Sequence, residues 1–262
     1  MARILITGST DGFGFEAARQ LIERNHEVYL HARSQERAEE VKAKCPGAAG
    51  VFIADLTTVA ETRKLAEEVN AIGGTFDAVI LNAGLLYGPY RKTTDLGVPS
   101  SIFVNLVAPY ILAALIKPPK RLIFVASVLH HEAKTDLKDI FWLEREEQWN
   151  DFQAYCDSKF HVVLLANAMA RRLKNKNTSV ISLHPGYVPT KLAGKDAPGK
   201  MQDGIETYIM LAEGDYDVTL TGAYFDPKRE RVQPHALTAD EDKQEAIVKA
   251  CEDLTGVKVE SF

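Results

Sequence analysis

Short, almost uniformly apolar runs alternate with longer helical patterns along this chain. Seven runs have the length and composition of strands: residues 3–7, 27–32, 51–54, 78–82, 121–126, 179–184 and 221–225. Because apolar residues fill them nearly without a break, they are typical of strands buried on both faces of a parallel sheet. Helical patterns lie between or after them, at residues 14–24, 34–43, 59–71, 99–116, 153–174, 201–212 and 239–254. This alternation predicts an α/β, doubly wound Rossmann fold with an about seven-stranded parallel sheet and helices on both faces.

The chain is long enough for a large core and shows no sign of a second unit. It has 262 residues, of which 46% are hydrophobic and 26% are charged, as in ordinary globular proteins. No internal repeat, charge block or Pro/Ser-rich linker divides it, and α/β folds of this size are commonly single units. We therefore predict one domain over residues 1–262.

Charge and cysteine usage argue against several classes of partner. The formal net charge of −5 disfavours nucleic acid or an anionic membrane surface as the main partner. Cys45, Cys156 and Cys251 are too few and too scattered for a disulfide framework or a metal cluster. These features favour reduced thiols in the cytoplasm.

Neither a leader peptide nor a membrane span is expected. The first predicted strand begins at Arg3, which leaves no room for an apolar leader. The apolar stretch 101–116 is interrupted by Asn105 and Pro109, and it stops short of the roughly 20 residues that a span needs. We expect a soluble protein in which this stretch is a helix buried on two sides.

Polar residues and glycines gather where the predicted strands end. In doubly wound sheets, ligands bind beyond the carboxyl ends of the strands, near the point where the strand order reverses. The residues found there are Thr7-Gly8, Asp55, Asn82-Ala83-Gly84, Ser127 and Pro185-Gly186. The sequence therefore predicts a binding site at this edge of the sheet.

A glycine-rich turn follows the first strand and opens the first helix. Gly8, Gly12 and Gly14 allow a tight bend and a close backbone approach, and the amides of the helix N-terminus attract anions. The alternative is a merely flexible strand-to-helix turn, because glycine motifs alone are weak signals. The preceding apolar strand and the following helical pattern favour a site for the pyrophosphate of a nucleotide.

Ser127, Tyr155 and Lys159 form the candidate catalytic group. Tyr155 and Lys159 share one face of a helix, and the lysine charge is expected to depress the tyrosine pKa, normally near 10. Ser127 would hydrogen-bond a substrate oxygen and stabilise the charge that develops there. Each residue also has an ordinary reading, a solvated helix face for the pair and a strand-end cap for Ser127. Their occurrence together with the glycine turn favours catalysis.

The glycine turn and this group together resemble the short-chain dehydrogenase/reductase family, from Thr7 to about Thr190. Ser127 and Tyr155 are 28 residues apart. That spacing, together with the segments around Ser127, Tyr155 and His184-Pro185-Gly186, is similar to the retinol dehydrogenase-like branch. Leu81 and Pro109 depart from residues that are frequent in the family.

The resemblance implies roles for further residues. Asn105 would be a fourth catalytic residue that anchors a water relay to Lys159, and Lys159 would also hold the nicotinamide ribose. Asp55 and Leu56 would meet the adenine, although Asp55 or Thr57 could simply cap the next helix. The cofactor-binding residues implied in this way are Gly8, Ser9, Thr10, Gly12, Phe13, Gly14, Arg33, Ser34, Asp55, Leu56, Asn82, Ala83, Gly84, Tyr155, Lys159, Pro185, Gly186, Val188 and Thr190.

The end of the second strand predicts a preference for NADP(H) over NAD(H). An acidic residue there would bind the ribose of NAD, but Ala32 stands in its place. Arg33 follows and can bind a 2′-phosphate, to which Ser34 could add a hydroxyl. Arg33 could also be a solvated residue and Ser34 a helix cap. Asp11 points mildly the other way, because some NADP-dependent members carry a basic residue in this turn.

The predicted activity interconverts a carbonyl and an alcohol, with Tyr155 as the acid/base. The alternative is a non-catalytic NAD(P)-binding regulator or scaffold, against which the complete catalytic group argues. An epimerase of the extended branch would need more than the roughly 70 residues that follow Thr190. A hydrolase is disfavoured because the chain lacks a Gly-x-Ser-x-Gly element.

The segments expected to wall the pocket indicate a small to medium lipophilic substrate. They supply a mostly apolar set: Leu85, Leu86, Tyr87, Tyr90, Trp142, Tyr187 and Leu192. Several of these could equally be core residues. No metal is expected: His130 and His131 are adjacent and lack an acidic partner at ligand spacing, so they are interpreted as loop residues near the pocket mouth.

A homodimer or homotetramer is predicted through the helices that carry Asn105 and Tyr155. Apolar residues cover more than one stripe of each helix, which suggests that one stripe packs on the sheet and another on a partner. On the first helix these are Ile102, Phe103, Leu106, Val107, Tyr110, Ile111 and Ala114. On the second they are Phe160, Val163, Leu164 and Ala168.

Overall fold

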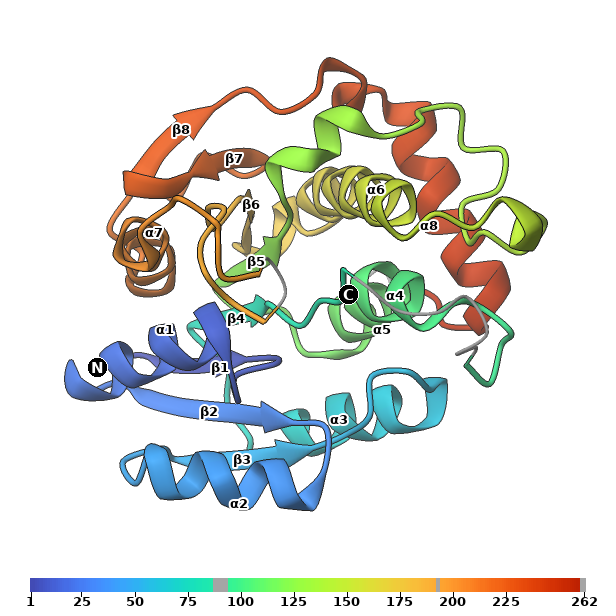
Figure 1. Ribbon diagram of the computed structural model, residues 1–262. Coiled ribbons are helices and arrows are strands. Elements are labelled where there is room, and N and C mark those ends of the chain that lie inside the picture. The colour runs from blue at the N-terminus through green and yellow to red at the C-terminus, as the bar shows by residue number, and fades with distance from the viewer. Residues whose placement is uncertain (87–93, 192–193, 260–262) are drawn as a thin grey trace.

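A computed structural model describes residues 1–86, 94–191 and 194–259 (Figure 1). Its strands form one sheet in the order β3-β2-β1-β4-β5-β6-β7-β8. Their bounds are β1 Arg3–Ile6, β2 Glu27–Ala32, β3 Gly50–Ile53, β4 Ala78–Leu81, β5 Arg121–Val125, β6 Ser179–Leu183, β7 Ala223–Asp226 and β8 Glu230–Val232. The order reverses beside β1, which has β2 on one side and β4 on the other. The doubly wound α/β fold is therefore confirmed.

One strand was not expected. β8 pairs antiparallel with β7, whereas all the other pairs are parallel. It has three residues, Glu-Arg-Val, and its two charged side chains are exposed at the edge of the sheet. Such a short, charged strand has no apolar run from which it could be predicted.

Helices cover both faces of the sheet (Figure 1). The face with Ile4 and Ile6 packs on α1 (Gly12–Glu23), α2 (Gln35–Lys44) and α7 (Met201–Glu213). The other face, with Leu5, packs on α3 (Val59–Ala71), α5 (Ala108–Leu115) and α6 (Asp151–Arg172). α8 (Glu241–Thr255) lies on α6 rather than on the sheet. Successive residues of a buried strand thus reach different cores, which is why the strands are apolar throughout.

The helix expected at 99–116 is present, but it is not α-helical throughout. It consists of α4 (Ser100–Ile102), a π-helical segment η1 (Phe103–Val107) and α5, with Asn105 in the π-helical segment. Short 3₁₀ segments complete the structure: η2 Val128–Glu132, η3 Glu146–Gln148, η4 Lys174–Lys176, η5 Pro227–Arg229 and η6 Ala236–Ala239. Within the described ranges, no helix is both long enough and apolar enough to span a bilayer.

The argument for an oligomer through η1, α5 and α6 was wrong in its premise. The apolar stripes on which it relied are buried within this chain, in the core that also contains residues of α3 and α8. Tyr110, for example, is fully buried and its hydroxyl donates to the carbonyl of Val257, just after α8. The chain itself covers the stripe that was assigned to a partner.

Candidate active site

The candidate residues converge at the carboxyl ends of β1, β4, β5 and β6 (Figure 1). Ser127 follows β5, and Tyr155 and Lys159 lie in the first turns of α6. In the described part of the chain, no group of three or more His, Cys, Asp or Glu side chains could hold a metal ion.

The turn after β1 requires its glycines. Gly8 and Gly12 have φ of +62° and +54°, which disfavour residues with a Cβ. A Cβ on Gly8 would lie 2.8 Å from the Cα of Ala83, and a Cβ on Gly14 would lie 2.6 Å from the carbonyl oxygen of Gly8. The turn is thus packed closely against the end of β4, and α1 begins at Gly12 with Asp11 as its N-cap. The amide of Gly12 donates to the Asp11 carboxylate at 3.0 Å, at a helix N-terminus of the kind that attracts anions.

Asn82 holds this turn in place. Its amide nitrogen donates to the carbonyls of Thr7 and Gly8, at 2.8 and 3.1 Å, and its amide oxygen accepts from the hydroxyl of Tyr208 at 2.7 Å. The side chain is therefore engaged with the protein itself. The resemblance implies that Asn82 lies beside the cofactor. In the structure its side chain stabilises the glycine turn that is expected to bind the cofactor.

His31 is a second support that the sequence did not reveal. Its Nδ1 accepts from the amide of Gly8 at 2.9 Å, and its Nε2 lies 3.0 Å from the carbonyl oxygen of Ala54, to which it donates. Burial lowers the pKa of His31 to about 4, so the ring is neutral at physiological pH. One histidine in an apolar strand carries no signal that separates such a strut from an ordinary core residue.

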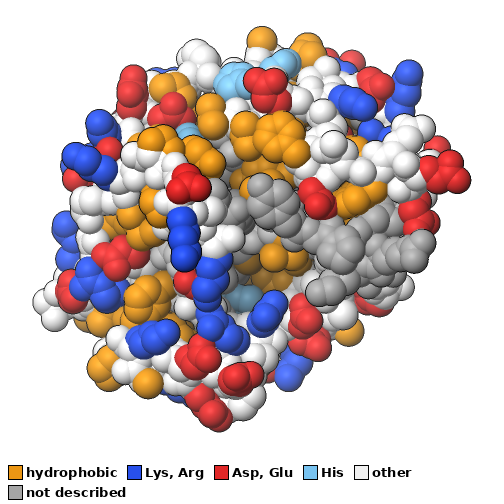
Figure 2. Space-filling model, viewed as in Figure 1, with side chains coloured by type: hydrophobic (Ala, Val, Ile, Leu, Met, Phe, Trp, Pro, Cys, Tyr) orange, Lys and Arg blue, Asp and Glu red, His pale blue; other side chains and the backbone are white. Residues whose placement is uncertain are grey.

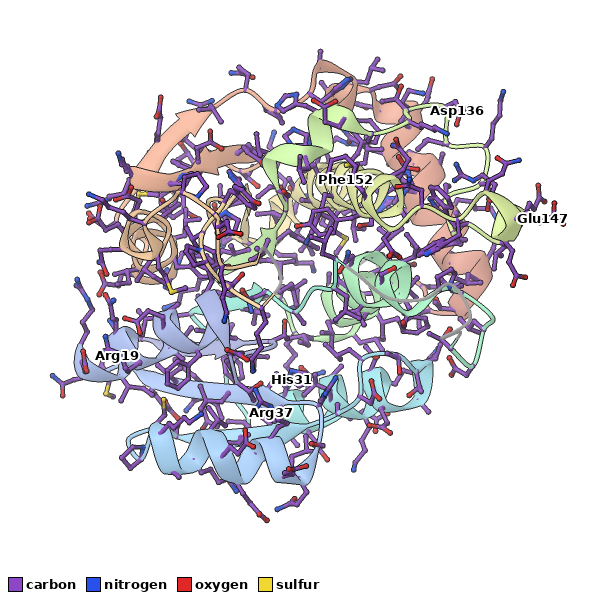
Figure 3. The ribbon with its side chains drawn as sticks, in the orientation of Figure 1. Arg19, His31, Arg37, Asp136, Glu147 and Phe152 are labelled. Carbon is purple, nitrogen blue, oxygen red and sulfur yellow. The ribbon has the colours of Figure 1, made fainter. Side chains whose placement is uncertain are left out.

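Basic side chains gather at the carboxyl end of β2. Figure 2 shows Lys and Arg side chains along the lower left of the central hollow. Arg33 is exposed, and Ser34 accepts from the amide of Arg37 as the N-cap of α2. Arg37, which the sequence analysis missed, donates to the hydroxyl and carbonyl oxygens of Thr10 at 3.2 and 3.3 Å. Figure 3 shows Arg37 and His31 near each other at this end of β2.

Asp55 lies in a local turn after β3. Its carboxylate accepts from the amide and hydroxyl of Thr57 at 3.1 and 2.9 Å, whereas α3 is capped by Thr58. Leu56 is buried. The alternative that Asp55 or Thr57 caps the next helix was wrong, because the N-cap is Thr58.

The loop after β6 lies over the glycine turn. Lys191 forms an ion pair with Asp11, and a Cβ on Gly12 would lie 3.8 Å from the Thr190 methyl. In the same loop, Gly186 has φ of +104° and Val188 is buried. The cofactor residues expected after β6 are thus brought beside those expected after β1.

Ser127, Tyr155 and Lys159 are buried together. Ser127 is the N-cap of η2, and its Oγ accepts from the amide of Leu129 at 3.2 Å. The Ser127 side chain lies close enough to the phenol of Tyr155 to lower its pKa. The Nζ of Lys159 donates to the carbonyl of Val125 at 2.8 Å and lies 5.5 Å from the centre of the Tyr155 ring.

The expected depression of the Tyr155 pKa was wrong. Burial raises the pKa of Tyr155 to about 12, and the Ser127 side chain acts in the opposite direction. Burial also lowers the pKa of Lys159 to about 8. Removal of each side chain from water dominates its own pKa, so the phenol is protonated at neutral pH.

Asn105 connects the end of β4 to α6. Its side chain exchanges two 2.8 Å hydrogen bonds with the backbone of Leu85 and donates to Ser158 Oγ at 3.0 Å. Ser158 in turn donates to the carbonyl of Tyr155. Gly84 lies between these groups, because a Cβ there would be 3.4 Å from Asn105 Oδ1 and 3.5 Å from Lys159 Nζ. π-helical turns often occur at functional sites, and this one places the Asn105 amide close to Lys159.

The expected pocket wall is only partly observed. Tyr87, Tyr90 and Leu192 lie outside the described residues. Trp142 belongs to the core instead, and its indole nitrogen donates to Asp157 at 3.1 Å. Tyr187 is 57% exposed. Phe152, which was not predicted to line the pocket, is 49% exposed. Figure 3 shows Phe152 in the first turn of α6, one turn before Tyr155.

Comparisons with known proteins agree with this geometry. The family model for short chain dehydrogenase matches residues 2–135. The chain is 81% identical over 262 residues to short-chain dehydrogenase chry4 of Gibberella zeae, covering 100% of both chains. It is 72% identical to short-chain dehydrogenase chyC of Penicillium rubens over 99% of both. Human retinol dehydrogenase 11 is 32% identical over 72% of this chain and 62% of its own.

Solved structures share the fold. A protein from Mycobacterium paratuberculosis superimposes with a TM-score of 0.83 at 22% identity, over 99% of this chain and 95% of its own. NADPH-bound carbonyl reductase from chicken fatty liver has a TM-score of 0.70 at 18% identity, over 88% and 98%. The chain belongs to the short-chain dehydrogenase family and is an oxidoreductase that acts on CH–OH groups.

Proposed function

We propose that this protein is an NADP(H)-dependent oxidoreductase that interconverts a carbonyl and an alcohol on a small to medium lipophilic substrate. The observation that carries the proposal is the burial of Ser127, Tyr155 and Lys159 together, next to a glycine turn whose shape excludes any side chain at Gly8 and Gly14. The family accounts for a nicotinamide cofactor, and solved relatives include an NADP complex of RhlG from Pseudomonas aeruginosa.

The residues fit a dinucleotide bound across the strand ends. The N-terminus of α1, where Asp11 is the N-cap, would face the pyrophosphate, and Lys159 would reach the ribose next to the nicotinamide. When bound, the cofactor supplies the hydride or accepts it. Arg33 and Ser34 would contact a 2′-phosphate, which gives the preference for NADP(H).

The side chains of the site then handle the substrate oxygen and its proton. Ser127 Oγ donates a hydrogen bond to that oxygen and orients it beside the phenol. The raised pKa of Tyr155 keeps its proton available at neutral pH, so Tyr155 protonates the oxygen during carbonyl reduction. Exposed apolar side chains such as Phe152 and Tyr187 would hold the lipophilic part of the substrate.

Two general features complete the proposal. We place the protein in the cytoplasm, where its three free and buried cysteines suit a reducing compartment. We also propose that residues 1–262 work as one unit, because the site draws residues from β1 through α6 and from the loop after β6.

Replacement of Tyr155 tests the catalytic role. Tyr155→Phe should lower kcat by about 100-fold or more, because general acid catalysis contributes roughly 10²–10⁴, while NADPH binding measured by fluorescence stays within about twofold. Tyr216→Phe is the matched control, since this hydroxyl bonds Ser179 at the start of β6, remote from the site. A chelator should leave the activity unchanged. Near-normal turnover by Tyr155→Phe would refute the mechanism.

The cofactor preference is tested at Arg33. Arg33→Asp should raise the Kd for NADPH by about tenfold or more and leave the Kd for NADH unchanged or lower, because one phosphate contact is worth about 1.5–3 kcal/mol. Lys42→Asp makes the same charge change at an exposed position of α2, the helix that follows Arg33. Equal Kd values of wild type for the two cofactors, or an unchanged ratio in Arg33→Asp, would show that Arg33 is not the selector.

A further inference from the structure

We propose that His130 is a positioning residue that holds catalytic Ser127 at the correct distance from Tyr155 through hydrogen bonds at both of its ring nitrogens. This inference rests on the proposed function, because it assumes that Ser127 orients the substrate oxygen. It assigns a task to a histidine that the sequence placed at the pocket mouth, an expectation that was wrong. His130 is fully buried.

Each ring nitrogen of His130 has its own partner. Nδ1 lies 2.6 Å from the carbonyl oxygen of Ser127 and donates to it, since a carbonyl can only accept. Nε2 accepts from the amide of His235 at 3.0 Å. Only the neutral tautomer with its proton on Nδ1 makes both bonds, which assigns the protonation state from geometry.

The bonds restrict Ser127 from two sides. The carbonyl of Ser127 accepts from Nδ1 and also from the backbone amide of His130 at 3.1 Å, so both of its lone pairs are used. Its Oγ accepts from Leu129. Backbone and hydroxyl are thus fixed together, and the hydroxyl can direct its own proton toward the substrate.

His235, the residue that binds Nε2 of His130, packs against α6, the helix that carries Tyr155. His235 is the N-cap of η6. The centre of its ring lies 5.3 Å from that of the Phe160 ring in α6. Asn167 of α6 also donates to the carbonyl of Thr238 in η6. His130 therefore ties Ser127, at the end of β5, to a segment that is itself anchored on α6, and so it sets the distance between the serine hydroxyl and the phenol.

The surroundings keep His130 neutral. The ring faces His131 at 4.0 Å and Tyr224 at 5.0 Å between centroids, and His184 and His235 act on it electrostatically. Burial lowers the pKa of His130 to about 4, and the neighbouring histidines act in the same direction. The hydrogen bond to the Ser127 carbonyl acts in the opposite direction but does not overcome burial, and none of these neighbours is a carboxylate.

Two near-isosteric substitutions separate the ends of the strut. His130→Asn keeps a donor at the position of Nδ1, whereas His130→Gln keeps an acceptor at the position of Nε2. We expect His130→Gln to lower kcat by at least tenfold with the Kd for NADPH within twofold of wild type, and His130→Asn to stay within about threefold in kcat. The probes are NADPH binding by fluorescence and NADPH oxidation with 4-nitrobenzaldehyde or the aldehyde or ketone turned over fastest.

A purely structural role gives a different result. Both variants would then lose melting temperature, and kcat per folded enzyme would stay within twofold of wild type or fall equally in both; either outcome overturns the proposal. If wild type turns over but Tyr155→Phe turns over equally well, the proposed function fails instead. The tautomer is checked without any substitution: ¹⁵N-labelled wild type should show His130 protonated on Nδ1 alone at pH 7, and any other state contradicts the strut.

Discussion

An alanine at position 14 should disrupt the support of the glycine turn. Its Cβ would lie 2.4 Å from the amide nitrogen of Asn82 and 2.6 Å from the carbonyl oxygen of Gly8, and the second of these atoms is backbone. Real Cβ atoms do not approach so closely, so Asn82 must leave its place or α1 must move away from β4.

The cost follows from the bonds that Asn82 makes. Displacement of its side chain breaks the hydrogen bonds to Thr7 and Gly8 and the one from Tyr208, each worth about 0.5–1.5 kcal/mol. Strain of a tightly packed site adds about 1–3 kcal/mol. The better helix propensity of alanine returns up to about 1 kcal/mol. We expect a net loss of roughly 1.5–7.5 kcal/mol, which lowers Tm by about 3–30 °C in a chain of this size.

Thermal unfolding followed by circular dichroism measures this loss, and NADPH fluorescence titration measures the effect on the turn. Gly47→Ala is the matched control: its Cβ would meet only a methyl of the partly buried Ile22 side chain. We expect a change of less than about 1 kcal/mol there. If Gly14→Ala melts within 2 °C of wild type and binds NADPH normally, the close packing inferred for the turn is wrong.

Three further perturbations test other parts of the structure. Burial lowers the pKa of His31 to about 4 and that of His161 to about 3, whereas a histidine in the unfolded chain has a pKa near 6.5. As the pH falls, the unfolded chain therefore binds protons before the folded chain does. Folding stability is full above pH 6.5 and declines toward pH 4, by roughly 2 kcal/mol per histidine at pH 5. Urea unfolding at pH 7.5 and pH 5 checks this, and equal midpoints would contradict it. Asn105→Ala should lower kcat at least tenfold and stability by about 2–4 kcal/mol, because three hydrogen bonds are lost; unchanged kinetics would remove Asn105 from the site. Asp157→Asn should cost about 1–3 kcal/mol, since its carboxylate accepts from Lys134, Gln153 and Trp142, and an unchanged Tm would refute that role.

The sequence was most informative where one residue type is physically required. Apolar runs marked every strand that is buried on both faces, but not β8, which is short and charged. Gly8 and Gly14 were recognisable because a side chain cannot fit there. The helix of Tyr155 and Lys159 was predicted from the helical pattern of residues 153–174, and the spacing of the two residues placed them on one face of it.

What the sequence did not reveal depends on contacts between distant segments. His31 and His130 are struts only because Ala54 and His235 lie opposite their rings. The pKa of Tyr155 depends on how deeply the fold buries it, which helical spacing does not report. Apolar stripes likewise do not say whether the same chain or a partner will cover them.

The π-helical turn also constrains insertions and deletions in this part of the gene. A π-helix closes each turn with an i→i+5 bond, so η1 holds one residue more than the α-helical turn it replaces. A deletion of one residue from Phe103–Val107 would let the helix become regular while the flanking turns keep their phase, but the turn that presents Asn105 would be lost. Asn105 would then leave Leu85 and Ser158. This short segment should therefore tolerate substitution more readily than any change in length.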